Sequence, residues 1–269
     1  MRPLPNAMMV RASTAPFVDL KAIVGAGGLV VLAPHPDDES LGCGALLRAA
    51  AVSGRPVAVV VVTDGRRSHP CSPSVDADEL ARMRALEVRA ALTALHPDIL
   101  LVELGYPDCA APRELPQARV AARAIASVVD AVSATALAAA WRGDPHTDHV
   151  ATADLAGRVR ALRPGLRIWS YPIWGRFAPA ETAAPRRIVR FDVAPNRAAK
   201  AAAIACHRTQ MTPMIDDDPQ GFLMTADAGP LHRAPGGVFC RRMRCARISP
   251  RSMRARTTHG ARTKAHMSR

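Results

Sequence analysis

Two short apolar runs in the first quarter of the chain constrain its fold more than any other feature. Residues 28–34 read GLVVLAP and residues 56–63 read PVAVVVVT, without the polar alternation typical of a strand that has one face in water. Continuous apolar runs of this length predict strands buried on both faces, as in a parallel sheet covered by helices. Residues 40–53 between them are expected to form a helix with Ser40 as its N-cap, which supplies the crossover that parallel strands require.

The same alternation continues through most of the chain. We expect further strands at residues 98–103, 136–141, 166–171 and 188–193, and further helices at residues 78–95, 117–133, 149–162 and 196–207. Strands that alternate with helices are joined by right-handed crossovers into a mostly parallel sheet. The predicted fold is therefore α/β, with a Rossmann-like, doubly wound sheet in a three-layer α/β/α arrangement.

The two ends of the chain depart from this pattern. Residues 1–20 are irregular and predict a loose N-terminal arm, so the folded domain is expected at residues 21–230. Residues 231–269 contain 11 Lys or Arg and no Asp or Glu, and they lack apolar periodicity. We therefore expect a basic, disordered tail. A reading frame that shifts near Leu231 is a second hypothesis for the break in composition.

The distribution of charge bears on the class of partner. The net charge is +13, but the first 230 residues hold 25 basic and 23 acidic residues and are nearly neutral. The body of the chain therefore presents no basic surface for specific nucleic-acid recognition. A protein that binds nucleic acid through its tail stays open as an alternative, because polybasic segments bind without sequence specificity.

The sequence also predicts where the protein works. No run approaches the roughly 18 apolar residues of a membrane span, and the N-terminus lacks the apolar stretch and cleavage site of a secretory signal. The six cysteines form no C-x-x-C pair, as expected for reduced thiols; they are Cys43, Cys71, Cys109, Cys206, Cys240 and Cys245. We expect a cytoplasmic protein, and the sequence does not indicate its oligomeric state.

The clearest chemical signal follows the first expected strand. Residues 35–39 read HPDDE, which places three carboxylates side by side. Such carboxylates repel one another unless a cation or hydrogen bonds compensate for their charge. A metal ion is the simplest compensation: His35 and Asp38 can reach one ion from a turn, while Asp37 points elsewhere as a candidate general base. The segment also lies where doubly wound sheets bind their ligands, beyond the carboxyl ends of the strands.

A second cluster follows the fourth expected strand. Residues 144–149 read DPHTDH, and His146 and His149 are three residues apart, so they share one side of a helical turn. Two imidazoles and a carboxylate with one open position form a catalytic zinc set. A single histidine at a helix start is more often a cap or a core residue. Two such clusters at the ends of buried strands favour a metal site over a purely structural role.

These motifs resemble those of the PIG-L/LmbE-type deacetylase family, which includes N-acetylglucosaminyl-phosphatidylinositol deacetylases and the mycothiol-pathway deacetylase. Residues 33–47 (APHPDDESLGCGALL) are similar to its first motif. Residues 63–70 (TDGRRSHP), Arg84-x-x-Glu87 and residues 146–156 (HTDHVATADLA) are similar to the later ones. Lys200 and residues 207–210 (HRTQ) resemble the closing Lys…His-x-Ser-Gln element, with Thr in place of Ser. The resemblance spans residues 29–222.

The resemblance implies a role for each matching residue. His35, Asp38 and His149 match the metal ligands. Asp37 matches the general base that takes a proton from water. His146 matches the residue that stabilises the oxyanion and protonates the leaving amine.

Three further positions are candidates for substrate contact. Arg84 matches an arginine that the family uses for substrate binding. Asp64 and His69 follow the second strand, near the expected site, where loop residues line many α/β sites. Asp148 is expected to orient one of the imidazoles from behind.

Together these features predict a metal-dependent hydrolase that removes an acyl group, acetyl by resemblance, from the amide nitrogen of an amino-sugar-type small molecule by metal-activated water. Zinc is the expected ion, and iron(II) is the alternative because the ligand set accepts either. The rival enzyme is a non-haem iron oxygenase, which also uses two histidines and one carboxylate. Those oxygenases usually have β-sandwich scaffolds, whereas this sequence predicts alternating strands and helices.

Overall fold

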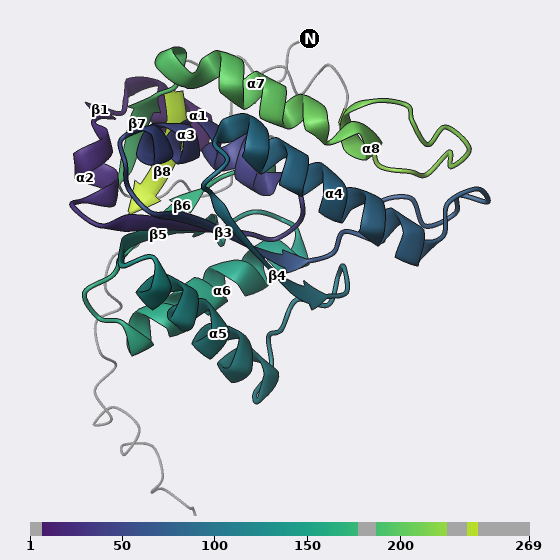
Figure 1. The fold of residues 1–269 in the computed structure, drawn as a ribbon, viewed down its shortest axis with the longest axis horizontal. Coiled ribbons are helices and arrows are strands. Elements are labelled where there is room, and N and C mark those ends of the chain that lie inside the picture. The colour runs from purple at the N-terminus through teal and green to yellow at the C-terminus, as the bar shows by residue number, and fades with distance from the viewer. Residues whose placement is uncertain (1–6, 177–186, 225–235, 242–269) are drawn as a thin grey trace, which may run out of the picture.

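The computed structural model describes residues 7–176, 187–224 and 236–241, which form an eight-stranded sheet between two layers of helices (Figure 1). The strands are β1 (Phe17–Val18), β2 (Gly28–Ala33), β3 (Val57–Thr63), β4 (Leu100–Tyr106), β5 (Ala134–Ala140), β6 (Arg167–Tyr171), β7 (Ile188–Asp192) and β8 (Gly236–Arg241). The helices are α1 (Ala7–Thr14), α2 (Leu20–Val24), α3 (Gly44–Val52), α4 (Ala77–Leu95), α5 (Gln117–Ala131), α6 (Thr147–Leu162), α7 (Arg197–Cys206) and α8 (Arg208–Met211). Within these ranges, no helix has the length and apolar character that a membrane crossing requires.

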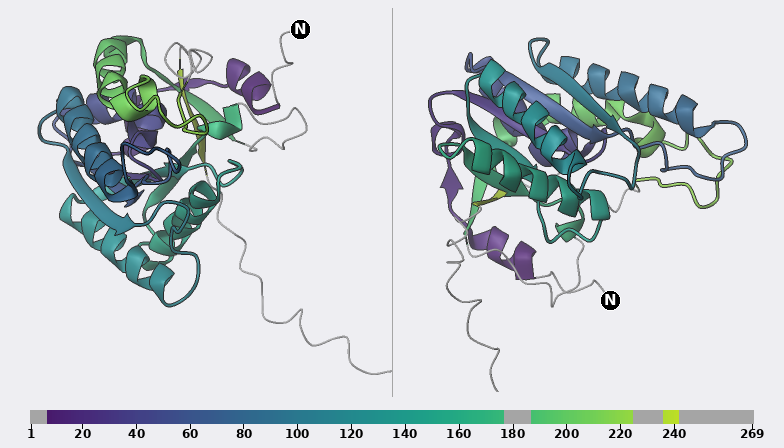
Figure 2. Two further views of the ribbon diagram at one scale, coloured as in Figure 1. Left: turned by 90° about the vertical axis from the view of Figure 1, so that its right-hand side faces the viewer. Right: turned by 90° about the horizontal axis from the view of Figure 1, so that it is seen from below.

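The sheet has the order β1-β7-β8-β6-β5-β2-β3-β4, and every pair is parallel except the two that involve β8. Helices α5 and α6 cover one face, side by side in Figure 2, and α3, α4 and α7 cover the other. Alternate residues of β2 pack into these two layers: Leu29 and Val31 on the α3 side, and Val30 and Leu32 on the α5 side. The predicted three-layer α/β fold, with central strands buried on both faces, is confirmed.

The first helix after β2 begins differently from the prediction. A π-helical turn (Glu39–Cys43) precedes α3, so Ser40 lies inside this turn and does not act as an N-cap. The backbone carbonyl of Asp37 accepts hydrogen bonds from the N–H groups of both Ser40 and Leu41. Gly42 lets the turn pass close to β6, because a Cβ atom there would lie 2.2 Å from the ring of Tyr171. A local sequence pattern does not reveal such a contact.

The predicted tail is wrong for six of its residues. Residues 236–241 form β8, which pairs antiparallel with both β6 and β7, inside the sheet and beyond the predicted domain end at residue 230. Phe239 is 1% exposed and Cys240 is also buried. A strand that pairs in register with two others argues against a shifted reading frame before residue 236. The run VFC is too short to give a periodic signal, and residues 242–269, with Cys245, lie outside the described residues.

The predicted loose arm is also wrong where the structure describes it. Helix α1 packs Met8 and Ala12 against Ile188, Val238 and Cys240, and β1 pairs with β7 at the edge of the sheet. The helix can bury these side chains only after β7 and β8 have assembled. The burial of these side chains therefore depends on tertiary contacts and not on a local pattern, which explains why the sequence of residues 7–18 predicts an irregular arm.

The site lies where the order of the sheet changes direction. Strand β2 has β3 on one side and β5 on the other, so the chain that leaves β2 and the chain that leaves β5 emerge next to each other. Ligand sites of doubly wound sheets form at such a point. The HPDDE segment follows β2, and the DPHTDH segment follows β5.

We expect Phe239→Ala to lower the free energy of unfolding by about 3 kcal/mol or more, because it removes a buried aromatic side chain from the sheet–helix core. Val120→Ala is the control, since Val120 is 61% exposed and should change stability by less than about 0.5 kcal/mol. Urea unfolding followed by circular dichroism measures both. Equal stabilities of the two variants would show that β8 is not part of the folded core.

Candidate metal centre

Asp38 lies between two histidines at the carboxyl ends of β2 and β5. Its Oδ2 atom is 3.3 Å from Nδ1 of His35 and 3.3 Å from Nε2 of His149. Ligand atoms about 2.0–2.2 Å from a tetrahedral zinc ion lie about 3.3–3.6 Å apart, so the distance from Asp38 to each histidine is the one expected for two donors that share an ion. The structure therefore brings together the three residues that the sequence predicts as ligands.

The orientation of His149 is fixed from behind. Its Nδ1 donates to Oδ2 of Asp144 at 2.9 Å, and Asp144 also accepts the backbone N–H groups of Ile173 and Gly175. In the neutral ring this bond keeps the proton on Nδ1, so that Nε2 would offer its lone pair toward Asp38. Nε2 is buried and has no hydrogen-bond partner among the described residues. A buried acceptor without a partner is costly, and a cation would satisfy it.

His35 is held in the same way. Its Nε2 atom lies 3.2 Å from both Oδ1 of Asp108 and Oδ2 of Asp148, on the side of the ring opposite Asp38. Asp148 also accepts the backbone N–H groups of Cys109 and Ala111. Carboxylates behind metal-binding imidazoles fix the tautomer and raise the basicity of the ligand. Asp148 therefore lies where the sequence predicted it, whereas Asp108 and Asp144 carried no predicted role.

The electrostatics of the cluster favour a positive charge at its centre. Burial opposes the charged form of His149, but the carboxylates of Asp38 and Asp144 outweigh it and raise its pKa to about 9. The pKa of His35 is raised well above its usual value, because three carboxylates outweigh its burial. The histidines in turn outweigh the burial of Asp38 and lower its pKa. The same carboxylates would stabilise a divalent cation, whose binding displaces the imidazole protons.

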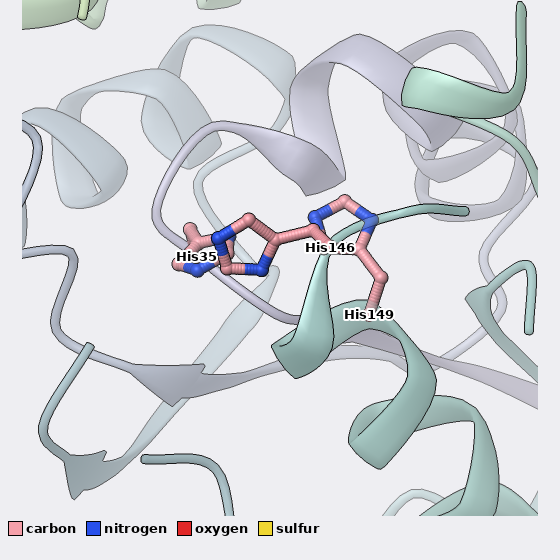
Figure 3. Close-up of side chains that lie close together, drawn as sticks. All are labelled: His35, His146 and His149. Carbon is pink, nitrogen blue, oxygen red and sulfur yellow. The ribbon is translucent and has the colours of Figure 1, made fainter. Parts of the chain in front are cut away.

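His146 is the third imidazole of the group (Figure 3). Its ring centroid lies 4.6 Å from that of His35 and 5.4 Å from that of His149. It is the N-cap of α6, where its Nδ1 accepts the backbone N–H of Asp148 at 3.2 Å. This bond places the ring proton on Nε2. Burial and the two neighbouring histidines lower the pKa of His146. The nitrogens of the three histidines lie within 4.8 Å of one another, but a ring with its proton on Nε2 is a donor there and not a ligand.

Asp37 differs from its neighbour Asp38 in both backbone and environment. Its φ angle is 138°, which is strained for a residue other than glycine, and its N–H donates to Oε2 of Glu39. Its Oδ2 accepts from Arg84 at 3.0 Å. Burial raises the pKa of Asp37 to about 6; Arg84 opposes this shift and the charge of Asp38 adds to it.

Arg84 is buried, with 3% of its surface exposed. Besides Asp37, its guanidinium donates to the carbonyls of Pro36 and Gly65. The sequence predicted a substrate-binding residue. Arg84 does reach the wall of the cavity, but its hydrogen bonds hold the turn that carries Asp37.

Glu39 ties this turn to the end of the chain. Its Oε1 accepts from Ser40 at 2.6 Å and lies 3.0 Å from Nε2 of His207, and both Glu39 and His207 are buried. Lys200 donates to the carbonyl of Leu41 at 2.9 Å. The closing Lys…His element therefore supports the HPDDE turn, a role that the sequence motif did not reveal.

Two predicted substrate contacts lie elsewhere. Asp64 pairs with Arg66 and accepts the N–H of Asp108, so it organises the loop after β3 and does not line the cavity beside the histidines. His69 is buried, with its Nδ1 3.1 Å from Oγ of Ser68 and its ring packed against Gly221. Position after a strand predicts the neighbourhood of these residues but not the direction of their side chains. Neither residue lines the cavity, and their contact with a substrate stays a prediction.

A cavity of about 260 Å³ opens over His35, Asp37, Asp38 and His146. Its apolar wall is formed by Leu41, Ile173, Trp174, Phe222 and Met224, and the rings of Trp174 and Phe222 meet edge to face at 5.4 Å. Polar side chains at its edge come from Arg67, Ser68, Gln210 and Gln220. Sequence patterns predict no role for most of these residues, because they come from loops that are distant along the chain.

Comparison with protein families matches residues 30–159 to the PIG-L family, described as GlcNAc-PI de-N-acetylase. Among solved structures, a deacetylase triple mutant (Orf2*T) of the teicoplanin biosynthetic pathway is 21% identical, with a TM-score of 0.63 over 80% of this chain and 97% of that chain. The N,N'-diacetylchitobiose deacetylase from Pyrococcus horikoshii is 22% identical, with a TM-score of 0.59 over 80% and 83%.

A structure with a different reaction also matches. GalB, the 4-carboxy-2-hydroxymuconate hydratase from Pseudomonas putida KT2440, is 18% identical, with a TM-score of 0.57 over 67% of this chain and 78% of that chain. No curated protein matches the chain. The structural matches establish the fold, and the choice of reaction depends on the site and on the family match.

We expect Asp144→Asn to weaken zinc binding by about 10- to 100-fold, because the amide no longer offers an acceptor to His149 and to two backbone N–H groups at once. Asp154→Asn is the control, since Asp154 pairs with Arg142 on the surface. Competition with a chelator, followed by metal analysis of the protein, gives both affinities. Equal zinc affinity in the two variants would exclude His149 as a ligand oriented by Asp144.

Proposed function

Because the chain belongs to the PIG-L family over residues 30–159, we propose that it is a metal-dependent N-deacetylase that hydrolyses the amide of an N-acylated amino sugar. One observation carries the proposal: the buried Nε2 of His149 has no hydrogen-bond partner among the described residues and lies 3.3 Å from the Asp38 carboxylate, beside a cavity that also exposes a carboxylate of raised pKa. This arrangement offers a cation site and a base in one place. A structural core would not require either.

His35, Asp38 and His149 would hold the ion. Two imidazoles and one carboxylate are a common set for catalytic zinc, and iron(II) accepts the same ligands. When bound, the ion supplies a Lewis acid that polarises the acyl carbonyl and makes water more acidic.

Asp37 is the proposed general base. With a pKa near 6 it is mostly ionised at neutral pH, yet basic enough to take a proton from the attacking water. The same proton can return from Asp37 to the nitrogen of the departing amine, since an amine anion is too poor a leaving group. Arg84 fixes the position of Asp37.

His146 is proposed to stabilise the oxyanion as a neutral donor. The cap bond to Asp148 N–H occupies Nδ1 and leaves Nε2–H free to donate. The family resemblance implies that this residue also protonates the amine. A neutral imidazole is a weak acid, so the hydrogen bonding of the ring supports the first role and not the second. The acid role falls to protonated Asp37.

The cavity supports a small substrate. Its volume of about 260 Å³ lies near the lower end of small-molecule sites, and its wall joins aromatic rings to amide side chains, a combination that suits a sugar ring. The parallel sheet with helices on both faces differs from the β-sandwich expected of the rival iron oxygenase.

The proposal predicts release of acetate and free amine from N-acetylglucosamine or its derivatives by the purified chain, loss of this activity after chelation, and recovery with added zinc. Asp37→Asn should retain its metal and lose about 100-fold or more in turnover, because it lacks the base. Asp38→Ala should lose both metal and activity. Oxygen uptake with a 2-oxo acid, in place of amine release, would contradict the proposal and favour the oxygenase.

Variants at His146 distinguish its helix-capping hydrogen bond from its proposed hydrogen bond to the oxyanion. His146→Asn keeps an acceptor for the helix cap but loses the ring N–H, so we expect normal metal content and turnover reduced by about 100-fold or more. Near-parental turnover of this variant would show that His146 only caps α6. If the parent enzyme shows an alkaline decline in kcat that His146→Asn abolishes, the ring acts as a charged acid and the neutral-donor mechanism is wrong.

The pH dependence of kcat tests the role of Arg84. Asp37 must be ionised, so activity should fall as the pH decreases through the pKa of Asp37. The charge of Arg84 lowers that pKa, so Arg84→Gln should move the acid limb to higher pH. Arg84→Lys keeps the charge and should move it less. An acid limb at the same pH in all three proteins would contradict the assignment of Asp37 as the base that Arg84 holds.

A further inference from the structure

Among the residues that the structure describes, Arg67 lines the cavity without a group that neutralises its charge. Two arginines line the cavity, Arg67 and Arg84, and Arg84 is paired with Asp37. The guanidinium of Arg67 makes no hydrogen bond or ion pair with any residue in 7–176, 187–224 or 236–241. Arg67 is exposed, so it faces both the cavity and the solvent.

The carboxylates that line the same cavity are already engaged. Asp38 lies between two imidazoles, and Asp108 accepts the backbone N–H of Arg67 and faces His35. No carboxylate of the lining is therefore left to pair with the Arg67 guanidinium.

The backbone holds Arg67 at this place. Its own N–H donates to Oδ2 of Asp108 at 3.1 Å, and the carbonyl of the next residue, Ser68, accepts the N–H of Phe222 at 2.7 Å. Gln210 donates to Oγ of Ser68 at 3.0 Å. The loop of Arg67 is thus joined to the segment of Phe222, another residue that lines the cavity.

The preceding residue, Arg66, differs from Arg67 because its guanidinium is paired within the loop. Arg66 bonds to Asp64 at 2.7 Å and to Asp78 at 2.8 Å, so its charge is used within the loop. Two adjacent arginines therefore differ in function: one fixes the loop, and the other presents its charge at the mouth of the cavity. A guanidinium offers paired N–H donors that match the oxygens of phosphate or carboxylate.

We propose that the substrate carries an anionic group, phosphate or carboxylate, on the part of the amino sugar that extends from the cavity, and that Arg67 binds this group. The acyl amide lies at the floor, beside Asp37 and His146, and the anion lies at the rim. This inference rests on the proposed function for the position of the amide. It adds the charge class of the substrate, for which Arg67 is the specificity-determining residue.

Binding to an inactive variant tests the proposal without dependence on turnover. The zinc-loaded Asp37→Asn protein is titrated calorimetrically with N-acetylglucosamine, N-acetylglucosamine 1-phosphate and N-acetylglucosamine 6-phosphate. We expect one phosphate ester to bind about 10- to 100-fold more tightly than the neutral sugar, the range of a charge-assisted hydrogen-bonded pair. The advantage should decrease with added salt.

Two further variants in the same background locate the effect. Arg67→Gln should abolish the advantage of the phosphate ester and leave the affinity for the neutral sugar within about twofold. Arg66→Gln, the matched control, should keep the advantage.

Each remaining outcome contradicts a defined part of the argument. Equal affinities for all three ligands, or a phosphate advantage that survives in Arg67→Gln, would overturn the role of Arg67 and leave the deacetylase proposal in place. Absence of binding by all three would overturn both the anion site and the amino-sugar substrate class.

Discussion

The candidate site depends on two parallel strands that end side by side. Strand β2 leads into the HPDDE turn, and β5 leads into the start of α6, so His35 and Asp38 meet His149 only after these strands have paired. Neither segment holds three donors in the required positions alone. Asp38 and His149 are both buried, and a buried charge without a partner costs several kcal/mol. The mutual pairing of these groups is therefore a condition of the fold as well as of the site.

Asp37 and Asp38 show how neighbouring residues of the same chemistry acquire different properties. Asp38 is surrounded by imidazoles, which lower its pKa and keep it ionised. Asp37 is turned away by its positive φ angle and meets one arginine, which only partly offsets its burial. The strained backbone persists because Glu39 accepts the N–H of Asp37 and is itself held by His207. The turn thus separates the proposed ligand Asp38 from the proposed base Asp37 by one peptide bond.

Sequence patterns predicted those parts of the structure that depend on local periodicity. The central strands and the helices α4, α5, α6 and α7 were expected within a few residues of their observed bounds, because each buries a continuous or periodic apolar face. The proximity of the candidate ligands could be anticipated because they cluster in two short segments that follow buried strands. Strand β8 and helix α1 could not, since their few apolar residues are buried only by partners distant along the chain.

Within the site, too, local patterns predict some features, whereas contacts between distant segments decide the others. Asp64 and His69 lie in the expected loop, but the direction of each side chain is decided by Arg66, Ser68 and Gly221. Asp108 lies in no motif, and the motif at residues 63–70, which contains Arg67, did not assign that side chain a role. Their positions follow from the contact between the loops after β3 and β4, where the N–H of Arg67 meets the carboxylate of Asp108.

The residues proposed for chemistry and the residues that form the cavity wall come from different parts of the chain. The residues proposed for chemistry, from His35 to His149, all lie within residues 30–159, the part that matches the family. The apolar wall of the cavity comes mostly from later residues: Ile173, Trp174, Phe222 and Met224. Lys200 and His207, also outside the match, support the catalytic turn from the opposite side. The apolar wall and the side chains that support the turn therefore both come mainly from residues after 172, whereas the residues proposed for chemistry precede residue 150.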